Sequence, residues 1–473
     1  MNVAMSQPDS VVALSQFAAS LRFVDVPAEI VAVAKNTVLD TLGVALASSG
    51  IGEGCAEVIE FVTAQGGAPE AAIWSTGRRV PAALAAMANG TLARALDYDD
   101  ILESPQTHVA VCVVPAAFAA AERLGRAVSG QEFIAALVVG CEIQHRLAMA
   151  MAQGQDSDEF PALIPTQIFG YFSAAAAAGR LLGLTPAKMH SALGLALMQT
   201  AGTEELVVHS ADSMGKTLYA AFCNQGGVQS ALLAECGVLA QGAVFDGKAG
   251  LFGAHYGGRY DRGPLGAGLG ETFVSANRVF KFWPGTLVTH PFIEAALGLI
   301  SAQDIAPGDI ADVTVRVGVW GRAMSEPLAV RRRPPTSSAA MNSLPFILAK
   351  VLVNGTVTLA DFKGKHRSEA AALAMAERIS YVFDPGLSPP GGPEGGVLEI
   401  RTRDGRTHGA TVKRPRGHPT RPLSFEEIAA KFRSNAGYAK IVPPADRLDK
   451  IIDLVRRLDE LADIREIVAS LVQ

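Results

Sequence analysis

The sequence contains little cysteine, and its cysteines are not grouped. Five cysteines occur in 473 residues, at positions 55, 112, 141, 223 and 236. Their number is odd, and the sequence has no Cys-x-x-Cys pair and no Cys/His cluster. This spacing argues against a disulfide framework, a zinc site and an iron–sulfur cluster, so we expect no metal. Gly215-Lys216-Thr217 resembles the end of a nucleotide-binding P-loop but lacks the preceding loop, so we expect no nucleotide cofactor either.

The sequence also lacks a strong charge imbalance and a long apolar run. Its formal net charge of -5 gives no general attraction to nucleic acid or to anionic lipid. The longest apolar run, Val109 to Ala121, is shorter than a membrane span and contains Pro115. The first residues do not show the basic and then apolar segments of a secretory signal. We therefore expect a soluble, cytoplasmic protein that binds neither nucleic acid nor membranes.

Helical periodicity is abundant. The length predicts two or three domains, and helix patterns dominate up to about residue 270. Beyond it, residues 311–319 alternate as a strand, and 397–402 and 408–412 flank a hairpin signal, Asp404-Gly405. We predict a mainly α protein with an inserted α+β domain: a large all-helical domain over residues 1–270, an α+β lid domain over 271–415, and C-terminal helices over 416–473 that return to the helical domain. The expected helices include 11–21, 27–46, 54–64, 80–96, 109–123, 131–151, 174–182, 187–198, 222–236 and 338–353.

One short stretch, residues 94–108, gathers most of the acidic side chains of its region. Asp97, Asp99, Asp100 and Glu103 lie between two alanine-rich helix patterns, and His108 follows them. A carboxylate that orients a histidine near a cleft is a common arrangement for moving protons. The same residues are also typical of a solvated loop that caps the next helix. On this stretch alone both interpretations stay open.

Longer segments along the chain resemble the MmgE/PrpD family. They are A-L-D-Y-D-D (95–100), V-P-A-A-F-A-A-A-E-R-L-G (114–125), S-G-Q-E-F-I-A-A-L-V-V-G-C-E-I-Q-H-R (129–146), A-A-A-A-G-R-L-L-G-L (175–184), F-K-F-W-P-G (280–285), P-P-T-S-S-A-A-M-N-S-L-P-F-I-L-A (334–349) and R-G-H-P-T-R-P-L-S (416–424). The similarity covers nearly the whole chain in the family's order. This family includes 2-methylcitrate dehydratase, cis-aconitate decarboxylase and iminodisuccinate epimerase. The resemblance implies a helical domain, a smaller lid domain, a homodimer and a cofactor-free active site between the domains.

The chemistry that the resemblance implies is proton transfer α to a carboxylate of a small polycarboxylate, followed by loss of water, loss of CO2 or reprotonation. Such a site needs cations for the carboxylates and a base with a pKa near the working pH. By the resemblance, Asp97 and Asp100 match the family's D-x-x-D, and His108 matches the histidine that closes this motif. Lys216 and Lys281 match two family lysines. These five residues are the expected catalytic residues.

Three further residues are expected to bind the substrate: Arg331, Thr166 and Thr286. Arg331 begins a run of three arginines, and one guanidinium there could bind a carboxylate through two hydrogen bonds. Tyr219 and His209 are candidates with less support. Glu142 and Arg146 share one face of the expected helix 131–151, and we expect them to form a buried structural pair.

Four positions depart from the family pattern. Ile101 replaces a threonine or serine, Ile164 replaces the histidine of H-P-[TS], and Thr286 replaces a cysteine or histidine. Trp320 lies near the position of a tyrosine that the decarboxylase branch uses. Loss of the imidazole at position 164 could remove the general acid needed for departure of water. Three functions therefore stay open: a dehydratase or decarboxylase, an isomerase or epimerase of a dicarboxylate, and a catalytically silent relative that binds polycarboxylates.

Overall fold

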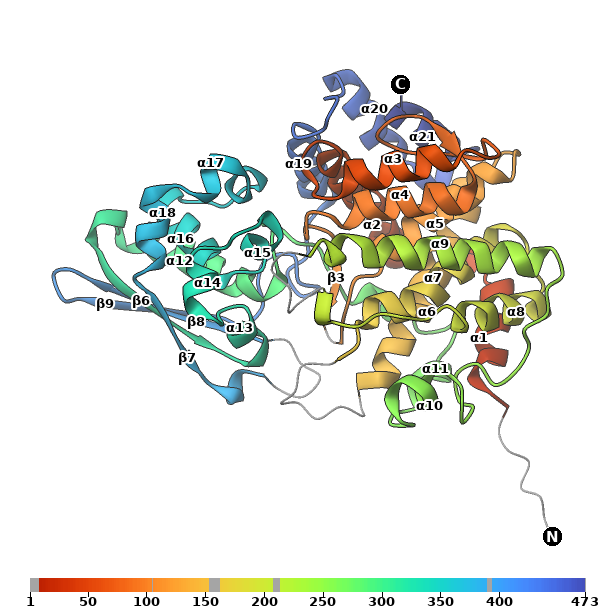
Figure 1. The fold of residues 1–473 in the computed structure, drawn as a ribbon, viewed down its shortest axis with the longest axis horizontal. Helices are drawn as coiled ribbons and strands as arrows, with labels where there is room; N and C mark the ends of the chain where they lie inside the picture. Colours follow the sequence, from red (N-terminus) through yellow and green to blue (C-terminus); the bar gives the residue numbers. More distant parts are fainter. Residues whose placement is uncertain (1–7, 104, 153–161, 207–212, 389–393, 473) are drawn as a thin grey trace, which may run out of the picture.

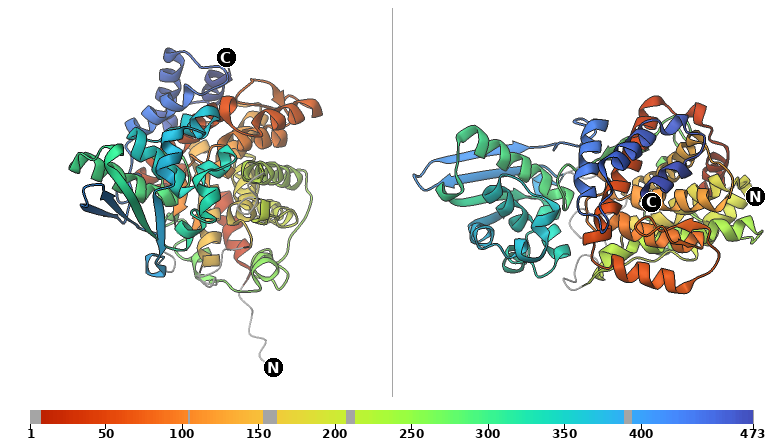
Figure 2. Two further views of the ribbon diagram at one scale, coloured as in Figure 1. Left: turned by 60° about the vertical axis from the view of Figure 1, so that its left-hand side comes forward. Right: turned by 90° about the horizontal axis from the view of Figure 1, so that it is seen from above.

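A computed structural model describes residues 8–103, 105–152, 162–206, 213–388 and 394–472. The protein is mainly α-helical with small sheets, as predicted. Two bodies are visible in Figure 1, a larger helical one and a smaller one built from helices and a sheet. The view from above in Figure 2 shows the same two bodies side by side.

The larger body is a bundle of long helices from the first half of the chain. Its helices are α1 (Ser10–Ser20), α2 (Ala28–Ile51), α3 (Cys55–Gln65), α4 (Ala82–Arg94), α5 (Ala110–Arg123), α6 (Gly130–Ala152), α7 (Pro165–Leu181), α8 (Pro186–Leu197) and α9 (Gly215–Glu235), with the shorter α10 (Leu251–Tyr256) and α11 (Gly263–Gly266). Small residues allow α7 to lie close to α9. A Cβ atom placed on Gly227 of α9 would lie 2.4 Å from the Cβ of Ala174 in α7. The alanine-rich sequence thus produces tight helix packing.

Two of these helices, α2 and α6, are long and apolar enough to cross a membrane by length and composition. The most apolar stretch of α2 is 78% buried inside the protein, and that of α6 is 94% buried. Burial of this extent is what the core helices of a globular protein show.

The smaller body is organised around a sheet with the strand order β7-β6-β8-β9. Its strands are β6 (Ile310–Val317), β7 (Ile379–Phe383), β8 (Gly396–Thr402) and β9 (Thr407–Val412). Strand β6 pairs with β7 in parallel and with β8 antiparallel, and β8 and β9 form the expected hairpin. Its turn contains Gly405 at φ 87°, a conformation that glycine adopts readily. The main helices of this body are α12 (His290–Gln303), α13 (Val319–Ala323), α14 (Leu328–Arg332), α15 (Ser337–Met341), α16 (Leu344–Asn354), α17 (Gly364–Arg367) and α18 (Ala370–Ala376).

The last three helices, α19 (Phe425–Ala436), α20 (Ala445–Arg456) and α21 (Arg465–Val472), pack on the helical body (Figure 1). Phe432 of α19 lies so close to α2 that a Cβ atom on Gly43 would be 3.1 Å from the Cα of Phe432. Their buried side chains belong to the same apolar core as those of the first 280 residues, while a second core is centred on residues 283–400. We keep the division at 1–270, 271–415 and 416–473 as a proposal.

Tertiary packing shifts several helix ends from their predicted positions. Helix α2 was expected to end at Leu46 before Ser48-Ser49-Gly50, but it continues to Ile51. Gly50 is a contact point there, because a Cβ atom on it would lie 2.2 Å from the carbonyl oxygen of Tyr438. Helices α7 and α9 begin nine and seven residues earlier than expected, at Pro165 and Gly215. The single helix expected over 338–353 is two helices, α15 and α16, because Ser343 caps the second one.

Candidate active site

The stretch 94–108 is neither a helix nor a simple loop, because it contains a hairpin that sequence periodicity did not indicate. Strands β3 (Ile101–Glu103) and β4 (Gln106–Thr107) pair antiparallel. Strand β3 also pairs with β5 (Arg278–Val279), with Ile101 opposite Val279. This pairing holds the acidic residues beside Lys281, and β3 lies where the two bodies meet (Figure 1). Ile101 is buried in a small apolar group with Val279 and Leu287.

His108 is fixed on both its ring and its backbone. Its Nδ1 atom lies 2.6 Å from Oδ2 of Asp99. Its backbone N–H donates to Oγ1 of Thr166 at 3.0 Å, and its carbonyl oxygen accepts a hydrogen bond from the Gln144 amide at 2.8 Å. Ser173 in turn donates to the Gln144 oxygen at 2.7 Å, which fixes the orientation of that amide. The imidazole is therefore held in one position before any ligand arrives.

The charges around His108 set its protonation state. Burial and the Arg94 guanidinium lower the pKa of His108 to about 4, although Asp99 opposes them. Burial disfavours the Asp99 carboxylate, but Arg94 and His108 outweigh it and hold the pKa of Asp99 below its usual range. Asp99 is then an acceptor, so the Nδ1 atom of the neutral ring carries the proton. No donor among the described residues contacts Nε2, so its lone pair can accept a proton at neutral pH.

Asp97 is surrounded by three cations. Its Oδ1 atom lies 2.7 Å from the Lys281 ammonium, its Oδ2 atom lies 2.6 Å from Lys216, and Arg94 contacts Oδ1 at 2.9 Å. Burial disfavours this carboxylate, but Arg94, Lys216 and Lys281 together hold the pKa of Asp97 well below its usual range. The backbone of Asp97 adopts a φ of 47°, a left-handed conformation that aspartate tolerates better than most residues. Strain of this kind often occurs at functional sites.

The cluster carries one positive charge more than its acids neutralise. Arg94, Lys216 and Lys281 face Asp97 and Asp99, since Arg94 also contacts Asp99 at 2.8 Å. The side chains of Arg94 and Lys281 are 0% and 1% exposed, whereas those of Lys216 and His108 are 20% and 12% exposed. A ligand would therefore meet Lys216 and His108 first. An excess of buried positive charge favours an anion.

Lys216 connects the two bodies. Its ammonium donates to Asp97 in the helical body and to Oδ1 of Asn342, at 2.5 Å, in the smaller body. Asn342 directly follows α15. Burial lowers the pKa of Lys216 to about 8, with Asp97 opposing this effect.

The returning C-terminal helices support the site from behind. Lys431 of α19 donates to the carbonyl oxygen of Tyr98 at 2.7 Å and to that of Lys281 at 2.9 Å. It also pairs with Asp40 of α2 at 2.7 Å. Lys431 thus joins the acidic stretch to the segment that carries Lys281.

Asp100 lies outside the cluster. Its buried carboxylate pairs with Arg278 at 2.7 Å. Asp97 and Asp100 were the carboxylates among the expected catalytic residues, whereas the carboxylate that contacts the His108 ring is that of Asp99. Residues 97, 99 and 100 are all acidic, and resemblance selected the first and last of them, whereas the hairpin turns Asp99 toward His108.

The expected substrate-binding residues have structural contacts. The Arg331 guanidinium donates to the carbonyl oxygens of Glu326, Asn342 and Ala323 at 3.0, 2.8 and 2.9 Å. These contacts position Asn342 and argue against the expected binding of a substrate carboxylate by Arg331. The Thr166 hydroxyl accepts a hydrogen bond from the backbone N–H of His108.

Of the remaining candidates, Tyr219 contacts the cluster, whereas Thr286 and Trp320 make other contacts. The backbone N–H of Thr286, five residues after Lys281, donates to the carbonyl oxygen of Met341 at 2.9 Å. Trp320 packs at the edge of the second core, and its backbone N–H donates to a carboxylate oxygen of Glu394 at 2.7 Å. Tyr219 belongs to the cluster, because its hydroxyl accepts a hydrogen bond from Arg94. His209 lies outside the described residues.

Sequence reasoning correctly predicted the Glu142–Arg146 pair and missed four members of the site. Glu142 and Arg146 are each 1% exposed and 3.2 Å apart. The missed members are Asp99, Arg94, Gln144 and Asn342. Arg94 and Asn342 lie in or beside segments that carry the family resemblance, so their position was a usable signal. Gln144 lies in the segment 129–146, which also carries the resemblance, so the same signal applied to it.

Asp97, Asp99 and His108 offer the geometry of a possible metal site. One ligand atom from each lies within 4.8 Å of the others. Both carboxylates already contact cationic side chains. A divalent ion would add two positive charges beside three existing ones, so this group does not fit a metal well.

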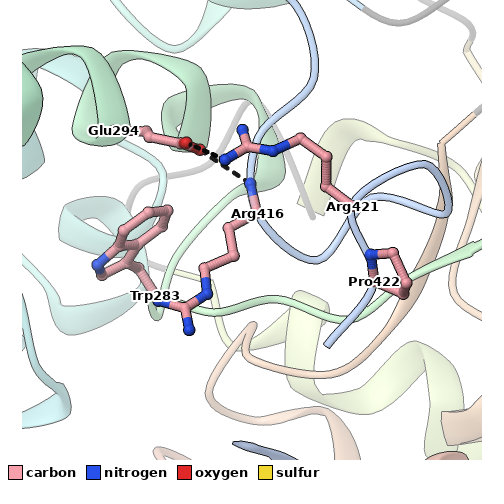
Figure 3. A pocket seen from close by; sticks show the side chains of 5 residues that line it. All are labelled: Trp283, Glu294, Arg416, Arg421 and Pro422. Atoms are coloured by element: carbon pink, nitrogen blue, oxygen red, sulfur yellow. Dashed lines mark hydrogen bonds and ion pairs between the residues drawn. The ribbon is translucent and has the colours of Figure 1, made fainter. Parts of the chain in front are cut away.

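A separate pocket of about 420 Å³ lies at the junction of α12 and the segment after residue 415. Figure 3 shows its lining residues, Trp283, Glu294, Arg416, Arg421 and Pro422. Glu294 pairs with Arg421 at 2.6 Å and accepts from the backbone N–H of Arg416 at 2.9 Å. No member of the His108 cluster lines this pocket in the described part of the chain, and its acid and one arginine neutralise each other.

Both halves of the chain match models of one protein family. The model of the MmgE/PrpD N-terminal domain matches residues 12–262, and that of the MmgE/PrpD C-terminal domain matches residues 283–468. A cis-aconitate decarboxylase-like protein of Aspergillus oryzae is 29% identical over 99% of both chains. The cis-aconitate decarboxylase of Aspergillus terreus is 28% identical over 95% of this chain and 93% of its own. The human cis-aconitate decarboxylase is 26% identical over 81% of this chain and 78% of its own.

Proposed function

The chain belongs to the MmgE/PrpD family, and we propose that it is a lyase, a decarboxylase or dehydratase, that acts on a small polycarboxylate. The names of its relatives support this class, since they are cis-aconitate decarboxylases or similar to one. Within the structure, one observation carries the proposal: a neutral, oriented His108 lies beside a cluster with excess positive charge.

In the proposed reaction, Lys216 binds a substrate carboxylate and His108 acts as the general base. Lys216 is the most exposed cation of the cluster and already has an amide oxygen, that of Asn342, as one partner. A carboxylate can take the place of this amide and gain a charge-assisted hydrogen bond. The Nε2 atom of His108 then accepts a proton from the carbon α to a carboxylate. Negative charge that develops on the substrate is stabilised by the fixed cations without reorganisation.

Substrate binding itself prepares His108 for this role. In the empty site its pKa is about 4, because burial and Arg94 disfavour the imidazolium. A substrate with two or three carboxylates brings negative charge next to the ring, and an opposite charge raises the pKa of a histidine. The base therefore becomes stronger when the substrate is present. We propose that this coupling lets the site work without a cofactor.

We also propose that the protein is a homodimer formed through the helical body. Met214, Leu218 and Phe222 are spaced four residues apart and lie on one face of α9 and its cap. Met214 is 48% exposed and Phe222 is 42% exposed. Leu233, on the same face further along α9, is 37% exposed. Leu218, between Met214 and Phe222, is half-buried. A stripe of apolar side chains that are partly or fully exposed is typical of a protein interface.

The test is proton exchange in heavy water, followed for a panel of di- and tricarboxylates that begins with cis-aconitate. Mass spectrometry of the recovered substrate reports abstraction of the α proton, while product analysis reports loss of CO2 or water. A lyase gives product, and His108→Gln gives neither product nor exchange. Exchange or inversion without loss of CO2 or water would indicate an isomerase or epimerase. Binding without exchange would indicate a silent relative, which the apolar Ile164 would favour, and either result would contradict the proposed lyase.

A further inference from the structure

The proposed reaction needs a proton donor as well as a base. In decarboxylation the C–C bond to a carboxylate breaks, CO2 leaves, and the electron pair left on carbon must accept a proton. In dehydration a hydroxyl group must leave as water, which also consumes a proton. His108 is the base and carries only the proton that it takes from the substrate, so a second group must act as the donor. His290 is a poor donor at neutral pH, because burial together with Lys281 lowers its pKa to about 3.

Glu204 is a buried acid that interacts electrostatically with Lys216 of this cluster. Glu204 is 6% exposed, and its Oε2 atom has no hydrogen-bond partner among the described residues. An ionised carboxylate without a partner is strongly disfavoured in such a place. Burial raises the pKa of Glu204 to about 8, with the Lys216 ammonium opposing this rise. Glu204 is thus a protonated acid at pH 7, within electrostatic reach of Lys216.

The backbone places Glu204 beside the segment where the family's imidazole is missing. Residues 162–164 and 202–204 run antiparallel, with a bridge between Leu163 and Thr203. The N–H of Ile164 donates to Gly202, and the N–H of Glu204 donates to Ala162, each at 3.1 Å. Two residues after Ile164, Thr166 holds the backbone of His108. Glu204 therefore lies on the partner segment of position 164, at the start of the helix that supports the base.

We propose that Glu204 is the proton donor of the reaction and takes the place of the imidazole absent at position 164. In dehydration its carboxylic acid O–H transfers its proton to the departing hydroxyl group, while His108 takes the α proton. In decarboxylation the O–H transfers its proton to the carbon from which CO2 has left, and the α proton held by His108 returns to the product. The resulting carboxylate is stabilised by the Lys216 ammonium, and a proton from water restores the acid after each turnover. This inference rests on the proposed lyase function.

The experiment compares the full-length protein with Glu204→Gln, which keeps the shape of the side chain but has no acidic proton. Glu205→Gln is the matched control, because Glu205 is the adjacent glutamate and is exposed. We expect Glu204→Gln to lose product formation by ~10²–10⁴-fold while it keeps exchange of the α proton, because His108 is intact. Glu205→Gln should keep both. Infrared difference spectra of the wild type should contain a carboxylic acid band that disappears near pH 8 and is absent in Glu204→Gln.

The outcomes separate the two proposals. Product formation at the wild-type rate in Glu204→Gln, or a wild-type spectrum without the acid band at pH 7, would overturn the role of Glu204 alone. Wild-type protein without exchange or product on any substrate of the panel would overturn both. If Glu204→Gln does not fold, Glu204→Asp serves as the second variant. Its shorter acid should slow product formation more than exchange, and equal effects on the two would overturn the inference.

Discussion

The Nδ1 atom of His108 lies 2.6 Å from a carboxylate oxygen of Asp99, while the next residue, Asp100, pairs with Arg278 instead. Two adjacent acids therefore have different surroundings and, we propose, different tasks. Asp99 orients a base and shares the buried Arg94 with Asp97, whereas Asp100 pairs with Arg278. This contrast supplies a matched pair of substitutions.

We predict that Asp99→Asn lowers kcat by ~10²–10⁴-fold, because an amide at this position can donate to Nδ1 and move the ring proton to Nε2, which removes the base. Asp100→Asn should instead lower the free energy of unfolding by about 3–5 kcal/mol, since it leaves the Arg278 charge buried and unpaired. Steady-state kinetics and chemical denaturation of both variants check this. Equal losses of kcat in the two variants would contradict the division of roles.

Substitutions of the two lysines of the cluster should have different effects, one on substrate binding and the other on stability. Lys216→Ala is expected to raise KM by about tenfold or more, because it removes a charge-assisted contact to a substrate carboxylate. Lys281 is 1% exposed and contacts both the carboxylate and the backbone carbonyl of Asp97. Lys281→Met should destabilise the protein by about 3–5 kcal/mol, since it breaks a buried pair. Lys216→Arg is the control that keeps the charge, and a KM as high as that of Lys216→Ala would argue against a purely electrostatic role.

The dimer proposal predicts that Phe222→Glu halves the mass measured by sedimentation at micromolar concentration. A charge in the middle of the stripe on α9 would be buried without a partner in the interface. Phe61→Glu is the control, because Phe61 is 53% exposed and lies on α3. A wild-type protein that sediments as a monomer would refute the proposal directly.

Much of the fold could be predicted from the sequence, because long periodic segments form helices whatever their neighbours are. Expected helices 109–123 and 131–151 differ from α5 and α6 by only one residue at each changed end. The site was less accessible, because it depends on pairings between distant segments. The contact between β3 and β5 joins residues 101 and 279, and no local pattern indicates it. For the same reason the choice of Asp99 over Asp100, and the link from Lys216 to Asn342, needed the structure.

Glu204 should leave a signature in the pH dependence of stability. Its pKa in the folded protein is about 8, above the 4.5 of an ordinary glutamate. Between these values the native state binds more protons than the unfolded state, so the free energy of unfolding falls as pH rises. Glu204→Gln removes this effect. As pH rises from 4.5 to 8, the variant should therefore gain stability relative to wild type, by about a few kcal/mol. Thermal melts across this range check it, and a constant difference, as expected for Glu205→Gln, would contradict it.

The last prediction concerns Ile164, which is 7% exposed and whose N–H donates to Gly202 on the segment that carries Glu204. If Glu204 supplies the proton that an imidazole at position 164 supplies elsewhere in the family, a histidine there should compensate for its loss. We expect Ile164→His, added to Glu204→Gln, to raise product formation at least ~10-fold above that of Glu204→Gln alone. The alkaline limit of kcat should also move to lower pH, since an imidazole loses its proton near or below 6.5, whereas Glu204 loses it near 8. Ile164→Asn in the same background is the control, because it adds polarity without a titratable proton. Rescue by asparagine, or rescue by histidine with an unchanged pH profile, would show that position 164 acts through packing and not through proton donation.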